Sequence, residues 1–208
     1  MKQLLTQARV FVFACVWMLG VSSAEAQLDR VYDMNGENFS GAVVQSSKDG
    51  VQLDKGGITK PYEAGGILKI MFEGDPPQLT KAREFALSGQ YNQALGELKK
   101  INIQVIARDI IKEDVDYYYA MSEAKLALSG QGEVDAAARR TLQFAQKYGN
   151  SWHFYDAGKL LGDLALASNN PEKALDFYRS LERAPSASMK IESKYLQGLT
   201  QLKMNKGP

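Results

Sequence analysis

The fold is decided by a sequence pattern that occurs three times, first as Ala86-Leu87-Ser88-Gly89-Gln90-Tyr91-Asn92-Gln93-Ala94-Leu95. It returns as Ala127-Leu128-Ser129-Gly130-Gln131-Gly132-Glu133-Val134-Asp135-Ala136 and as Ala167-Ser168-Asn169-Asn170-Pro171-Glu172-Lys173-Ala174-Leu175. Each occurrence ends one segment with helical periodicity, supplies a Gly or Asn turn, and opens the next segment with polar and small residues. This recurrence is typical of stacked helical hairpins, which usually bind other proteins rather than perform chemistry.

The helical part of the chain begins after Asp75-Pro76-Pro77, where prolines end the preceding segment. From there Ala, Leu, Glu, Lys and Gln replace glycine and β-branched runs. Apolar residues then recur with helical spacing. We expect helices at 78–88, 91–102, 106–128, 134–148, 152–167, 171–183 and 187–205.

Residues 76–208 resemble the tetratricopeptide repeat family. The matching residues are the Leu161-Gly162 pair in a first helix, then Ala174, Tyr178 and Pro185 in a second, with Gly89, Tyr91, Ala94 and Leu98 in an earlier repeat. The turn residues are spaced by 41, 39 and 38 positions, at Gly89, Gly130, Asn169 and Gly207. Because the family's period is about 34 residues, the resemblance implies a tetratricopeptide-like α-solenoid rather than a standard array.

The segment before the prolines, residues 27–75, is predicted to be a small β-structure. Short apolar or alternating runs at 30–32, 39–46, 51–53, 58–62 and 68–72 are separated by turn residues such as Gly36 and Asp49-Gly50. Five short strands favour a small antiparallel barrel, because closure removes exposed edges. The segment resembles SH3-like and Sm-like barrels, so the expected fold class is α+β and multi-domain.

The first 26 residues have the pattern of an export signal. Lys2 and Arg9 precede an apolar run over 10–21, and Ala24-Glu25-Ala26 is a small-x-small cleavage site that leaves Gln27 first. We therefore predict a periplasmic or secreted protein that is not inserted in a membrane after cleavage. Two alternatives remain open at this point: a retained signal anchor, and a lipid attached at Cys15.

Charge and composition narrow the classes of function. The chain has 25 basic and 24 acidic residues, and residues 27–208 have 23 of each, so no excess of positive charge points to a nucleic acid. Cys15 is the single cysteine and His153 the single histidine. We therefore predict no catalytic residues, no metal and no cofactor.

The resemblance implies a peptide-binding groove along the first helix of each pair. Transferred position by position, the groove comprises Arg83, Tyr117, Asp156, Lys159, Asp163, Lys194 and Gln197. Mixed charge with one aromatic residue suits a peptide held by polar contacts and an anchor side chain.

The last helix carries an apolar stripe of Ile191, Tyr195, Leu199 and Leu202. We expect this stripe to cover the preceding pair as a cap, the alternative being that further repeats are missing. The predicted function is a non-catalytic protein- or peptide-binding scaffold outside the cytoplasm. The alternative is a self-associating cell-envelope structural subunit, so a homo-oligomer stays open, and a hydrolase-like enzyme is a weaker rival.

Overall fold

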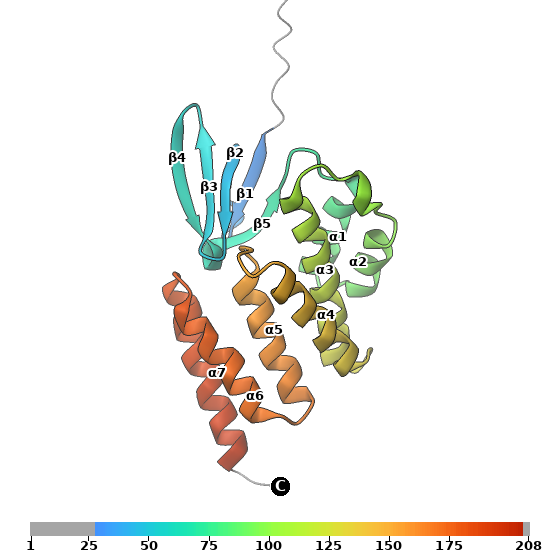
Figure 1. The fold of residues 1–208 in the computed structure, drawn as a ribbon, viewed down its shortest axis with the longest axis vertical. Helices are drawn as coiled ribbons and strands as arrows, with labels where there is room; N and C mark the ends of the chain where they lie inside the picture. The colour runs from blue at the N-terminus through green and yellow to red at the C-terminus, as the bar shows by residue number, and fades with distance from the viewer. Residues whose placement is uncertain (1–27, 206–208) are drawn as a thin grey trace, which may run out of the picture.

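The computed structural model describes residues 28–205, which fold as a five-stranded antiparallel sheet followed by seven α-helices (Figure 1). The α+β class is therefore confirmed. All five predicted strands are present, as β1 (Asp29–Asp33), β2 (Asn38–Ser47), β3 (Gly50–Lys55), β4 (Ile58–Glu63) and β5 (Ile67–Met71). The predicted export signal lies outside the described residues.

The sheet is open, so the prediction of a closed barrel is wrong. Its strand order is β4-β3-β2-β1-β5, and every neighbouring pair is antiparallel. Strands β4 and β5 form the two edges. A short 3-10 helix (Ala64–Gly66) follows β4 and redirects the chain. Closure is prevented because the chain after β4 returns beside β1 instead of pairing β4 with β5.

The helices match the predicted ranges to within a few residues. They are α1 (Pro77–Leu87), α2 (Tyr91–Leu98), α3 (Asp109–Leu128), α4 (Val134–Lys147), α5 (Phe154–Ala167), α6 (Pro171–Ser180) and α7 (Ala187–Asn205). The segment before α3 forms a separate 3-10 helix, Ile103–Val105. A further 3-10 helix, Leu181–Arg183, follows α6 directly.

The three repeated turns have the left-handed backbone that their residue types predict. Gly89, Gly130 and Asn169 have φ of 77°, 76° and 54°, a region in which Gly and Asn are tolerated best. Each turn joins helices that pack on one another, in the pairs α1–α2, α3–α4 and α5–α6. Consecutive pairs also pack together through α2–α3, α4–α5 and α6–α7.

Gly162 shows why a small residue is needed where α5 and α6 cross. A Cβ atom at this position would lie 2.3 Å from Cε1 of Tyr178. The ring of Tyr178 is fully buried there, and its hydroxyl donates a hydrogen bond to Asp163 Oδ1 at 2.7 Å. The glycine thus allows the tyrosine to close the hairpin, as the Leu-Gly pair predicts.

The sheet and the first helices share one cluster of buried side chains. The cluster includes Val31 and Ile70 from the sheet and continues to Leu164 in α5. An ion pair adds to the junction, since Arg108, the residue before α3, contacts both carboxylate oxygens of Asp29 at 2.7 and 3.0 Å. The sheet is therefore fixed against the helices by apolar packing and by charge.

Helix α7 is oriented opposite to the prediction. Its predicted inner stripe faces solvent: Ile191 is 71% exposed, Tyr195 64%, Leu199 45% and Leu202 57%. The buried face instead carries Met189, Ser193 and Thr200. Small side chains allow α7 to approach α6 closely, and Ser193 Oγ donates to the backbone oxygen of Tyr178 at 2.6 Å. The cap that we predicted on the apolar stripe is therefore wrong.

Candidate functional site

Arg83, the first residue predicted for the groove, is fully buried inside an ionic network. Its Nε donates to Asp114 Oδ2 at 2.8 Å, and its Nη2 donates to Asp75 Oδ1 at 3.0 Å. Asp114 is also fully buried, and Asp75 nearly so. Arg83 lowers the pKa of Asp114, which burial alone would raise. For Asp75 burial is the larger influence and its pKa is raised, as expected when two carboxylates share one guanidinium.

His153 extends this network from the residue before α5. Its Nε2 lies 2.9 Å from Asp114 Oδ1, and its ring stacks on Tyr117 with 3.6 Å between centroids. Burial lowers the pKa of His153 although Asp114 opposes the change. The imidazole is therefore neutral at neutral pH, and Nδ1 has no hydrogen-bond partner among the described residues. Tyr117 and His153 are both buried, so neither lines an open groove.

The five other predicted residues lie on α5 and α7. Lys159 forms an ion pair with Glu192 of α7, and Asp163 accepts the hydrogen bond from Tyr178. Lys194 and Gln197 both donate to Glu182 Oε1, at 2.6 and 2.8 Å. Asp163 thus joins α5 to α6, while Lys159, Lys194 and Gln197 hold α7 against α5 and the preceding 3-10 helix.

Asp156 is the predicted groove residue with the most perturbed ionisation. Burial raises its pKa to about 6, and Lys159 offsets only part of that increase. Its carboxylate forms no ion pair with another described residue. An ionised Asp156 is therefore held at a cost to stability.

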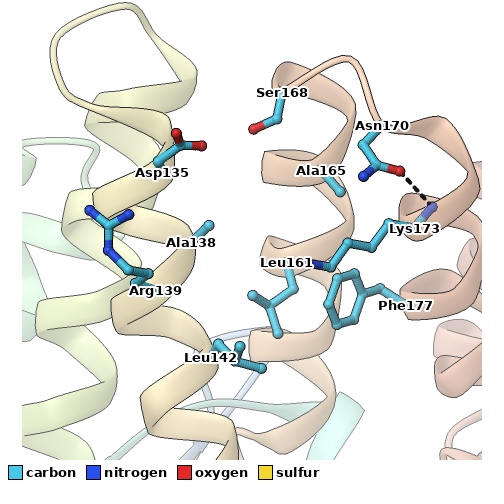
Figure 2. A pocket seen from close by; sticks show the side chains of 10 residues that line it. All are labelled: Asp135, Ala138, Arg139, Leu142, Leu161, Ala165, Ser168, Asn170, Lys173 and Phe177. Carbon is cyan, nitrogen blue, oxygen red and sulfur yellow. Dashed lines mark hydrogen bonds between the residues drawn. The ribbon is translucent and has the colours of Figure 1, made fainter.

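A groove lies between α4, α5 and α6 (Figure 2). It has a volume of about 290 Å³. Leu161 and Ala165 of α5 form its floor, and Ala138, Leu142 and Phe177 stand on its walls. Leu142 is 37% exposed. The groove therefore offers an accessible apolar surface of a size that suits one or two side chains.

The rim of this groove is charged. Asp135 and Arg139 project from α4 and Lys173 from α6 (Figure 2). None of the three forms an ion pair with another residue in the range 28–205. Two positive charges and one negative charge are therefore available to a ligand that lies over the apolar floor.

The sequence analysis missed this groove because it considered only the first helix of each pair. Its walls come mainly from α4 and α6, which are second helices. A signal was present in α4, where Ala138 and Leu142 form an i, i+4 apolar row beside the core row of Ala137, Thr141 and Phe144. A second apolar row on a helix indicates a second contact surface.

The sheet carries another open apolar face, over β2, β3 and β4. Phe39 and Tyr62 lie 5.1 Å apart there between ring centroids. The Lys60 ammonium lies 5.0 and 5.1 Å from the same two centroids. Ile58 adds to the hollow, which has a volume of about 410 Å³.

Residues 28–205 contain neither a cluster of metal ligands nor a helix suited to span a membrane. No three His, Cys, Asp or Glu side chains there come together in a way that suits a metal ion. None of the helices in this range combines the length and apolar character needed to cross a bilayer.

Comparisons with protein-family models, with curated proteins and with solved structures found no match to this chain.

Proposed function

We propose that the protein is a non-catalytic, peptide-binding scaffold that acts outside the cytoplasm, built on a tetratricopeptide-like stack of helical hairpins. The observation that carries this proposal is the groove between α4, α5 and α6, with its apolar floor and charged rim. It is open along one side, as a groove for a chain segment must be. Export rests on the pattern of residues 1–26 alone.

The chemistry of the groove defines the ligand. Leu161, Ala165 and Phe177 would surround an apolar side chain of the peptide. Because Arg139 and Lys173 outnumber Asp135 on the rim, an acidic residue next to that anchor is favoured over a basic one.

Selection from a displayed library of random peptides tests this proposal. We expect enriched peptides to carry a large apolar residue beside Asp or Glu. Replacing Leu142 by Glu should abolish their binding, because a carboxylate would then stand against the anchor side chain. Gln143→Glu adds the same charge on the same helix outside the groove lining and should bind as the parent does. Enriched peptides that bind Leu142→Glu unchanged would contradict the proposal.

A further inference from the structure

Helix α7 buries a face with small polar side chains and exposes an apolar face. Toward α6 it places Ser193 and Thr200, while Ile191, Tyr195, Leu199 and Leu202 face solvent. The helix lies at the end of the packed series, at the edge of the molecule in Figure 1. Its exposed stripe extends over about 17 Å at 1.5 Å per residue. A contiguous apolar stripe of this kind marks an interaction surface.

The stripe contains a tyrosine and a glycine, the two residue types that pack against each other in the α5–α6 hairpin. In the α5–α6 hairpin, Tyr178 packs over Gly162, where a Cβ would meet its ring. In α7, Tyr195 and Gly198 lie in the same stripe, three residues apart. A Cβ at Gly198 would meet nothing within 4 Å. The glycine is therefore open to receive a tyrosine ring from outside.

We propose that the α7 stripe binds the α7 stripe of a second copy of this chain, with the two helices antiparallel. A two-fold axis between positions 196 and 197 sets Tyr195 opposite Gly198 of the partner subunit. The same axis sets Ile191 opposite Leu202 of the partner subunit. Both contacts occur twice, as the symmetry of an isologous interface requires.

The charges on one edge of the stripe are complementary in this direction. Glu192 and Lys203 are eleven residues apart, which places them on one edge of α7 three turns from each other. In an antiparallel pair, an edge of one helix lies against the same edge of the other helix, which runs in the opposite direction. Glu192 of one copy therefore lies near Lys203 of the partner subunit. In a parallel pair Tyr195 and Gly198 would instead each meet their own copy, so the tyrosine would lose its glycine partner. Glu192 already contacts Lys159 in its own chain, and its carboxylate has capacity for a second donor.

A second copy fits this surface better than an unrelated helix, because the stripe supplies its own complement in both shape and charge. A single pair of helices this long buries less than the roughly 1,200 Å² of a standard interface. We therefore expect a reversible dimer that dissociates on dilution. This surface is separate from the α4–α6 groove, so the two proposals can fail independently.

Sedimentation equilibrium of the full chain over a range of concentrations tests the dimer. We expect a monomer–dimer equilibrium whose dissociation constant rises at least about 100-fold in Tyr195→Glu, a change equivalent to roughly 2.8 kcal/mol. Gly198→Ala should also weaken the dimer, although alanine favours the monomer's helix. Val105→Glu is the matched control, because Val105 is 75% exposed and lies outside both the α4–α6 groove and α7. It introduces the same charge at another exposed apolar position and should leave the dissociation constant unchanged.

Charge reversal checks the direction of the helices. Lys203→Glu alone should weaken the dimer. Adding Glu192→Lys together with Lys159→Glu should restore it, because the edge contacts between copies are re-formed with opposite signs and the ion pair within each chain is kept. A monomer at every concentration would overturn the proposal. So would a dimer that Tyr195→Glu leaves intact. Failure of the triple variant to restore association would overturn the antiparallel arrangement.

Discussion

The two ends of the helical series differ in which side chains they enclose and which they expose. At the first end, Arg83, Asp114 and His153 are charged or polar and fully enclosed. At the last end, Ile191 and Tyr195 are large, apolar and mostly in solvent. The first arrangement stabilises one packing of α1, α3 and α5, because a buried charge without its partner is costly. The second leaves a surface free for another molecule. Residue type alone therefore does not distinguish core from surface in this protein.

Removing the arginine at the first end should give the largest effect. Arg83→Met leaves Asp75 and Asp114 buried without their counter-charge, which should lower the free energy of unfolding by about 3–5 kcal/mol. Urea denaturation measures the change. Arg108→Met is the comparison, because Arg108 is one-third exposed and water can replace part of its contact with Asp29. A loss below about 1 kcal/mol in Arg83→Met would show that the network does not stabilise the fold.

Gly162 and Gly198 offer a matched pair of substitutions, the first inside a close helix crossing and the second on the exposed stripe of α7. Gly162→Ala forces a methyl group into the Tyr178 ring and should cost about 1–3 kcal/mol. Gly198→Ala meets open space and should gain up to about 1 kcal/mol from helix propensity. Thermal unfolding at low protein concentration, where the monomer dominates, measures both. Equal changes in the free energy of unfolding at the two sites would contradict the close packing of Tyr178 against Gly162.

The pH dependence of stability reports on Asp156. Its pKa is about 6 in the folded chain and 3.8 as the ordinary value, so the folded state binds the proton more tightly. The contribution of Asp156 to stability should therefore fall as pH rises from about 4 to 6 and then level off, and the difference between the parent and Asp156→Asn isolates it from the other carboxylates. Two pH units correspond to about 3 kcal/mol, and partial access of water reduces this to about 1–2. Asp156→Asn should remove that decrease and be more stable than the parent at pH 7. Parallel curves for the two proteins would contradict the raised pKa.

The smallest effect is expected on the exposed stripe of the monomer. Ile191→Ser should change the free energy of unfolding by no more than about 0.5 kcal/mol in dilute solution, because the side chain contacts mainly water. Met189→Ser, on the buried face of the same helix, should cost about 2–5 kcal/mol by analogy with other truncations of buried apolar residues. If Ile191→Ser proved as costly as Met189→Ser, the stripe would be packed inward as a cap.

The sequence predicted those features that local chemistry determines. Turn residues marked Gly89, Gly130 and Asn169, and each adopts the expected backbone. The alternating and apolar runs marked all five strands. The resemblance also predicted the close approach at Gly162. These features depend on a few neighbouring residues, so a short window of sequence is sufficient to find them.

Features set by packing between distant segments were not predictable in the same way. Arg83 is a residue type expected in a peptide-binding groove. It is buried instead because Asp75 and Asp114, from two other segments of the chain, pair with it. The amphipathic pattern of α7 showed two faces without showing which one meets α6. The more apolar face is exposed to solvent, because Ser193 and Thr200 on the other face permit a closer approach to α6. Sheet closure likewise depended on where β5 pairs, which no local pattern records.

Amide hydrogen exchange of α7 at increasing protein concentration tests most directly the claim that the last end of the series is an interaction surface for a second copy. We expect exchange across residues 191–202 to slow as concentration rises, while exchange in α3 around Asp114 stays constant. In Tyr195→Glu the concentration dependence should disappear. Exchange in α7 that is independent of concentration in the parent chain would contradict the account.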